Sequence, residues 1–170
     1  TQHTITVTIN GRDDGAVIGG VDTAAVSEDT HVNAGHLDTS GQLTITDADA
    51  GQAQFIAQTS AAGYGEFAID TSGHWSYSAD NTQSAVQQLK TGESLTDSLT
   101  VTSADGTTHT VTVTIQGTND APVLQAQTQA VTEGGAMLSG YMAATDVDAG
   151  DTQTFSLANA VDGFTLNADG

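Results

Sequence analysis

The chain has 170 residues, with 21 acidic and 2 basic side chains, a formal charge of −19, no cysteine and one proline. Two cations are too few to neutralise phosphates, which excludes unaided binding to nucleic acid or to anionic membranes. Disulfides are excluded by composition, and no apolar run reaches the roughly 18 residues of a membrane-spanning helix. The acids divide into 17 Asp and 4 Glu, which favours turns and cation sites over helical surfaces.

Short segments that alternate apolar and polar residues recur along the chain. They are residues 5–9, 43–46, 67–69, 75–77, 99–102 and 111–115. A period of two places one set of side chains in a core and leaves the intervening threonines facing water. Turn signals lie between them at Ser40-Gly41, Ser72-Gly73 and Asp105-Gly106, and the last predicts a hairpin. Many short strands predict an all-β sandwich or barrel.

One segment, residues 81–92, breaks this alternation. It begins with Asn81, a possible N-cap, continues with helix formers and ends at Gly92. The pattern predicts a short helix of at most two turns that crosses between the two sheets. Its apolar residues Ala85, Val86 and Leu89 would pack against the sandwich.

The chain also repeats itself. Four blocks recur in the same order: residues 5–14 match 111–120, residues 26–29 match 131–134, residues 46–51 match 145–150, and residues 67–73 match 164–170. The offset falls from 106 to 97 residues, so the second copy is the shorter one. Four ordered matches indicate tandem repetition.

The repeat register divides the chain into three parts. We expect residues 1–14 to form the last strand and linker of a preceding repeat, and residues 15–118 to form one complete β-sandwich repeat. Residues 119–170 would then be the linker and first half of the next repeat. Residue 1 is Thr and the register begins inside a repeat, so we expect a piece of a longer chain.

The acids gather at fixed points of the repeat. Asp-x-Asp loops occur at Asp47 and Asp49 and again at Asp146 and Asp148, with Asp151 following. Two carboxylates at i and i+2 in a turn that ends with Gly can converge on one hard cation such as Ca²⁺, and the adjoining linker residues Asn119 and Asp120 would add oxygens. Without a cation, these carboxylates would repel one another and hold the linker open. The alternative is ordinary turn chemistry, which Asp and Asn also favour.

Taken together, these motifs resemble the VCBS-type repeat of large bacterial surface adhesins of the RTX type. The motifs are the junction at 117–122, the opening at 131–133, the loops at 46–51 and 145–150, and the segments 64–67, 73–77 and 89–97. The resemblance covers essentially the whole chain. It implies tandem Ig- or cadherin-like Greek-key β-sandwiches, secreted by a type I system to the calcium-rich exterior of the cell.

The resemblance further implies a non-catalytic extender that carries an adhesive tip. Its partners would be neighbouring repeats of the same chain and, through another domain, a host or biofilm surface. Carried over by position, the Ca²⁺ ligands would be Asp13, Asp14, Glu28, Asp47 and Asp49 at the first junction, and Asn119, Asp120, Glu133, Asp146 and Asp148 at the second. The first junction departs from the pattern, because it lacks the proline corresponding to Pro122 and carries Arg12.

Two other functions remain open. A repeat could itself bind a glycan through Trp75, Tyr77 and Tyr64, although aromatic residues on a strand favour the core of a sandwich. Alternatively, the chain could be an accessory β-sandwich of a secreted enzyme. The sequence has no nucleophile motif, no phosphate-binding loop and no histidine pair with convincing metal spacing, so we expect no catalysis by the chain itself.

Overall fold

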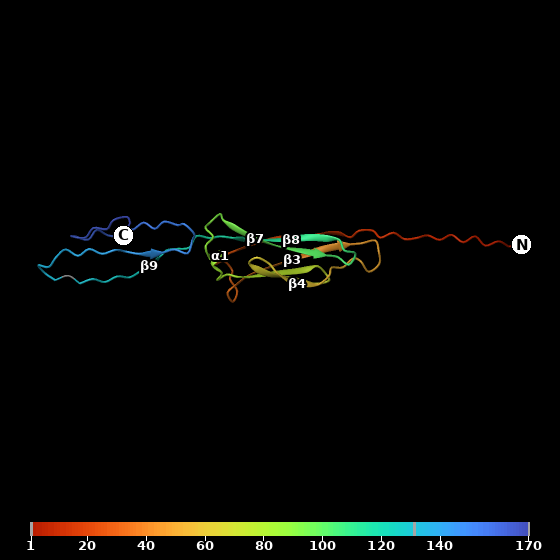
Figure 1. The fold of residues 1–170 in the computed structure, drawn as a ribbon, viewed down its shortest axis with the longest axis horizontal. Helices are drawn as coiled ribbons and strands as arrows, with labels where there is room; N and C mark the ends of the chain where they lie inside the picture. The colour runs from red at the N-terminus through yellow and green to blue at the C-terminus, as the bar shows by residue number, and fades with distance from the viewer. Residues whose placement is uncertain (1, 131, 170) are drawn as a thin grey trace.

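A computed structural model describes residues 2–130 and 132–169. Thr1, Val131 and Gly170, with the parts of the repeat matches that fall on them, lie outside the described residues. Figure 1 shows an elongated molecule in which a β-sandwich is flanked by extended chain on both sides. The all-β prediction is confirmed.

Two sheets face each other in the sandwich. The larger has the order β1 (Val17–Gly20), β3 (His36–Thr46), β6 (His74–Asp80), β5 (Gly65–Ile69) and β4 (Gln58–Ala61). The smaller has the order β2 (Thr23–Ser27), β8 (Thr108–Gln116) and β7 (Ser94–Thr102). Strands β7 and β8 form the predicted hairpin, whereas β2 pairs with β8 in parallel. That parallel pair brings an early and a late segment of the repeat to the same end of the sandwich.

The core lies between the sheets and follows the alternation of the sequence. In β8, Val111, Val113 and Ile115 are fully buried, while the threonines between them are only partly covered. From the larger sheet, Trp75 and Tyr77 lie fully or almost fully buried in the same cluster. Period-two patterning thus assigned the inward faces of the main strands.

The crossover helix keeps within the predicted limit of two turns. It is a single turn, α1 (Ser84–Gln87), between β6 of the larger sheet and β7 of the smaller. Asn81 is not its N-cap, since the helix begins after Gln83, which makes no side-chain cap. Val86 and Leu89 are buried as expected, but Ala85 is exposed.

The turn predicted at Ser40-Gly41 is wrong, because both residues lie inside β3. A Cβ at Gly41 would come within 2.6 Å of ring carbons Cε2 and Cζ2 of Trp75. Glycine is needed here so that the buried indole can lie flat against the strand, not to allow a turn. The Trp75 Nε1–H then donates to the carbonyl of Val21 at 2.7 Å.

We therefore expect Gly41→Ala to lower the free energy of unfolding by about 1–3 kcal/mol, the usual cost of overpacking a core. Urea unfolding would measure it. Gly19→Ala is the matched control, since the nearest atom to its new Cβ is Thr44 Oγ1 at 3.5 Å, an ordinary contact. Equal stability of the two variants would contradict this explanation of Gly41.

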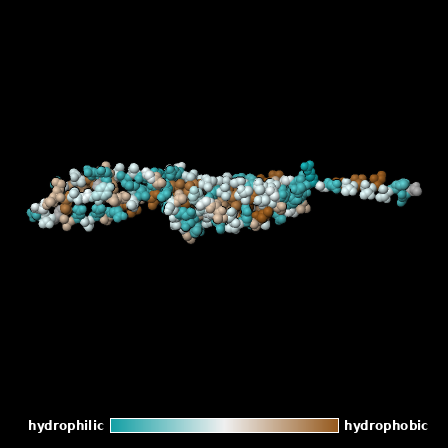
Figure 2. Space-filling model, viewed as in Figure 1, coloured by the Kyte–Doolittle hydropathy of each residue, from teal (hydrophilic) through white to brown (hydrophobic). Residues whose placement is uncertain are grey.

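The two ends of the chain are largely unpaired. The predicted strand at 5–9 forms no ladder among the described residues, and Ile5, Val7 and Ile9 are 88%, 77% and 90% exposed; Figure 2 shows apolar side chains along this thin segment. Within the part of the second copy that the structure describes, the ladder is the short pair of β9 (Val123–Leu124) with β10 (Ala144–Thr145). Several of its apolar residues are exposed, Met137 and Tyr141 among them.

Candidate cation sites at the two junctions

The second junction begins where β8 ends and the linker starts. Ser27 pairs with Gln116 at the end of the parallel β2–β8 ladder, so Glu28 lies beside the first linker residues. Its backbone N–H donates to the Gln116 carbonyl at 3.0 Å, and its Oε1 accepts from the Thr118 N–H at 2.7 Å. Glu28 is fully buried. The register of β2 on β8 thus places Glu28, which comes early in the repeat, beside the linker at the end of the same repeat.

Asp29 is held by two amide side chains at the same end of the sandwich. It has a φ of 55°, in the left-handed region that Asp tolerates better than most residues. Asn81 Nδ2 donates to its carboxylate at 2.7 Å and Gln87 Nε2 donates at 3.1 Å, and these bonds hold the pKa of Asp29 below its ordinary value. Asn81 Oδ1 also accepts from the Asp29 N–H at 3.2 Å. Asn81 therefore fixes Asp29 and does not cap α1.

The following repeat contributes its Asp-x-Asp loop. The Asp148 N–H donates to Asp146 Oδ1 at 3.0 Å, and the linker N–H of Asp120 donates to Asp148 Oδ2 at 2.8 Å. Asp148 is 3% exposed. Asp146, Asp148 and Asp151 each place one carboxylate oxygen within 4.8 Å of the others. The 146–151 loop and the linker are therefore joined by a hydrogen bond.

Among the residues that the structure describes, three buried carboxylate oxygens at this junction have no hydrogen-bond partner: Glu28 Oε2, Asp120 Oδ2 and Asp148 Oδ1. Burial raises the pKa of Glu28, and the charges of Asp120, Asp29 and Asp148 add to that effect, although the Thr118 N–H opposes it. Burial also raises the pKa of Asp120, helped by Asp29 and Asp148. Buried carboxylate oxygens without a hydrogen-bond donor are costly, and an oxygen-only set of ligands of this kind fits a hard cation such as Ca²⁺.

The raised pKa values predict a pH effect in metal-free protein. An acid whose pKa is raised in the folded state is stabilised in its protonated form, so that stability is present below the unfolded pKa and lost as pH rises through the folded one. In EDTA we therefore expect the wild type to gain thermal stability relative to Glu28→Gln as pH falls from neutral towards 4.5, the ordinary pKa of Glu28. Calorimetric melting would measure it. A constant difference between the two proteins over that interval would contradict the assignment.

The first junction has the same local arrangement. The Asp49 N–H donates to Asp47 Oδ1 at 2.7 Å, and the linker N–H of Asp14 donates to Asp49 Oδ2 at 2.7 Å. Gln52 Nε2 donates to Asp13 Oδ1 at 2.8 Å. Asp47 Oδ2 and Gln52 Oε1 are buried without a partner. The hydrogen bonds within the Asp-x-Asp loop and from the linker to the loop thus recur at both junctions.

The structure regroups the residues predicted as ligands. Asp13, Asp14, Asp47 and Asp49 come together at the first junction, but Glu28 lies at the second, with Asp120, Asp146 and Asp148. Asn119 is exposed, and its Nδ2 donates to the Asp120 carbonyl at 2.6 Å. Glu133 is exposed in a turn.

The sequence prediction of the ligands did not include Asp29, and the roles of Asn81 and Gln87 were missed entirely. Asn81 and Gln87 hold Asp29 across 52 and 58 residues of sequence. The repeat itself carries a signal for Glu28, because Glu133 occupies the same position in the second copy. If the first and last strands of the smaller sheet pair in each copy, the acid at this position would lie beside the linker at the end of its own repeat.

A family model described as the bacterial cadherin-like domain matches residues 13–117. The chain belongs to this family. Comparison with curated proteins finds no match. The matched range contains every strand of the sandwich together with Asp13, Asp14 and Glu28.

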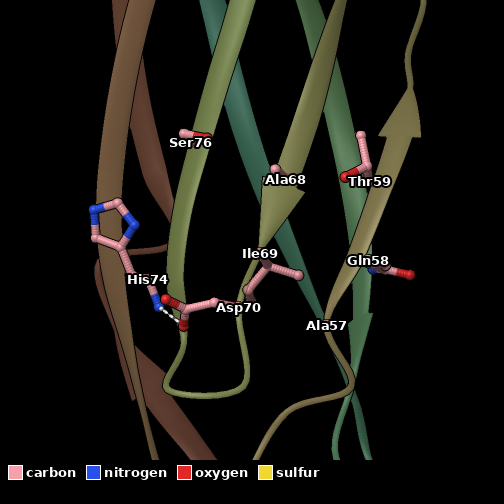
Figure 3. Close-up of a pocket in the computed structure, with 8 residues that line it drawn as sticks. All are labelled: Ala57, Gln58, Thr59, Ala68, Ile69, Asp70, His74 and Ser76. Carbon is pink, nitrogen blue, oxygen red and sulfur yellow. Dashed lines mark hydrogen bonds between the residues drawn. The ribbon is translucent and has the colours of Figure 1, made fainter.

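Bacterial cadherin-like domains are generally non-catalytic and typically extracellular. No helix among the described residues is long and apolar enough to cross a membrane. Figure 3 shows a shallow depression on the outer face of the larger sheet, where Asp70 accepts a hydrogen bond from the His74 backbone N–H at 3.1 Å. That carboxylate also accepts from the Ser72 hydroxyl at 2.6 Å, so it serves the β5–β6 turn.

The aromatic residues of the cadherin-like domain do not form an exposed platform. Trp75 and Tyr77 are 0% and 1% exposed, and Phe67 packs on Tyr77 with ring centroids 4.6 Å apart. Tyr64 is partly buried against the same core. The core interpretation of Trp75 and Tyr77 is therefore correct.

Proposed function

We propose that the chain is part of an extender in a bacterial surface adhesin, in which Ca²⁺ binds at the junctions between consecutive cadherin-like repeats. The ion would hold each repeat against the next and stiffen the array. The VCBS-type resemblance, secretion by a type I system and a role in cell adhesion or biofilm formation belong to the same proposal.

One observation carries the calcium assignment. Glu28 from the sandwich, Asp120 from the linker and Asp148 from the following repeat each present a buried oxygen without a hydrogen-bond partner. The three groups come from both sides of a junction and from the linker itself. A divalent cation that drew these three groups together would offset their mutual repulsion and join the two repeats.

The equivalent geometry of the first junction supports an array. Asp14 and Asp49 there make the contact that Asp120 and Asp148 make at the second. An extender needs the same joint at each boundary, and tandem repetition supplies it. The large negative charge would then be partly balanced by bound ions in a calcium-rich exterior.

Amide hydrogen exchange measured by NMR tests this function. In millimolar Ca²⁺ we expect the N–H groups of Thr118 and Asp120, which donate to Glu28 and Asp148, to exchange at least about tenfold more slowly than in excess EDTA. The Leu99 N–H, inside the β7–β8 ladder, is the internal control and should change little. Equal protection of the junction amides in both conditions would refute the calcium-clamped junction.

A further inference from the structure

Lys90 is the only lysine of the chain, and the rest of the junction is dominated by acids. Its ammonium pairs with Asp151 Oδ1 of the following repeat, and the side chains of both residues are about 30% exposed. The hydrogen bond to Asp151 raises the pKa of Lys90, and the charges of Asp151, Glu93 and Asp148 add to that effect. The Lys90 ammonium therefore already pairs with a carboxylate on the other side of the junction.

The segment that carries Lys90 is fixed to the sandwich. Leu89 beside it is 8% exposed in the core, and the Lys90 N–H donates to Glu93 Oε2 at 3.2 Å. The Glu93 carbonyl in turn accepts from the N–H of Gly117, where the linker begins, at 3.0 Å. A Cβ at Gly117 would lie 2.4 Å from the Lys90 carbonyl. Lys90 thus extends from a segment that is held against Gly117, directly after β8.

A second contact from the segment that carries Lys90 involves no charge. The Gln88 carbonyl accepts a hydrogen bond from the Ala149 N–H at 3.2 Å. Ala149 follows Asp148 directly, and Gly150 lies close to the Lys90 ammonium. Gln88 and Lys90, two residues apart, therefore both contact the Asp-x-Asp loop of the next repeat, in addition to its contact with the linker.

We propose that Lys90 is a positioning residue that docks the 146–151 loop onto the preceding repeat before any cation binds. The acids of the second junction would then be pre-assembled for the ion, which lowers the ordering cost of binding. The first junction differs, because the position of Asp151 is taken there by Gln52, which bonds Asp13 instead. The part of the inference that concerns affinity rests on the proposed calcium site; the docking part does not.

The two roles open to Lys90 predict opposite results. If its charge acted only as a nearby cation, its removal would tighten Ca²⁺ binding, because like charges repel. If it positions the loop, removal weakens binding, since the ion must then order the loop itself. We expect Lys90→Met to weaken calcium affinity about three- to tenfold in calorimetric titration, and Lys90→Arg to restore it. Tighter binding by Lys90→Met would overturn the proposal.

Docking without metal is tested separately, by hydrogen exchange of the Ala149 N–H in excess EDTA. We expect wild-type protection to fall at least about fivefold in Lys90→Met and in Asp151→Asn. Arg12→Met is the matched control, because it removes the chain's other basic side chain, which lies exposed at the first junction. Unchanged Ala149 protection in Lys90→Met would overturn docking even if the wild-type chain binds calcium. A wild-type chain that binds no calcium yet loses Ala149 protection in this variant would refute the proposed function alone.

Discussion

Replacing Glu28 by Gln is expected to remove most of the calcium-dependent gain in stability at the second junction. A ligand at about 100 times its Kd stabilises the folded state by about 2.7 kcal/mol, or roughly 10 °C or more in Tm for a domain of this size. Glu28 contributes a buried oxygen that has no donor, so its neutral amide would lose the charge that attracts the ion. Calorimetric melting in millimolar Ca²⁺ and in EDTA measures the difference.

Glu66→Gln is the matched control for charge, because Glu66 is exposed in β5 on the outer face of the sheet. We expect it to keep the calcium-dependent shift of the wild type. In EDTA, Glu28→Gln should melt at or above the wild-type temperature, since it removes a carboxylate whose pKa is raised by burial and neighbouring acids. A calcium shift of undiminished size in Glu28→Gln would contradict its role as a ligand.

Replacing Asp97 by Ala is expected to destabilise the sandwich more than any other exchange of a single acid. Its carboxylate is 4% exposed and accepts from the N–H groups of Gly63, Tyr64 and Gly65 at 2.9–3.0 Å and from the Tyr77 hydroxyl at 2.7 Å. Each buried donor left without an acceptor costs about 1–3 kcal/mol. We expect a loss of at least about 4 kcal/mol, a large part of the stability of a typical domain.

Urea unfolding in excess Ca²⁺ measures this loss, with Glu66→Ala as the control that should stay within about 0.5 kcal/mol of wild type. Tyr77→Phe removes just one of the four donors to Asp97, so a smaller loss of about 1 kcal/mol is expected for it. The graded pair keeps the test informative if Asp97→Ala fails to fold. A loss below about 1 kcal/mol for Asp97→Ala would show that the loop at 63–65 finds other acceptors.

The sequence was most informative where structure is local. Each Asp-x-Asp loop closes on itself within two residues, as in the bond from Asp148 N–H to Asp146, and each loop does meet its linker. Period-two patterning likewise assigned the buried face of β8. Both features depend on neighbours in the chain, so a repeat of the pattern is a repeat of the geometry.

Contacts between distant segments were harder to predict. The position of Glu28 depends on the parallel register of β2 with β8, which no local pattern encodes. Gly41 resembled a turn because the indole that requires it lies on another strand. Asn81 resembled a helix cap because its partner, Asp29, lies 52 residues away. In each case, a residue type with a common local use serves a tertiary contact instead.

These contacts change how the net charge of −19 is understood. Much of it lies at two joints where carboxylates are held close together by backbone donors, and at the second joint a single lysine offsets part of the repulsion. Bound Ca²⁺ would offset the remainder. The charge would then make the stiffness of the array depend on the calcium outside the cell.

The most direct test is a crystal structure of this chain grown in calcium, with anomalous scattering used to locate the ion. The calcium-junction model predicts one anomalous peak at the second junction, within about 2.3–2.6 Å of Glu28 Oε2, Asp120 Oδ2 and Asp148 Oδ1. Ordered junction carboxylates with no peak between them, or a calcium ion bound without Glu28 and Asp148, would contradict it.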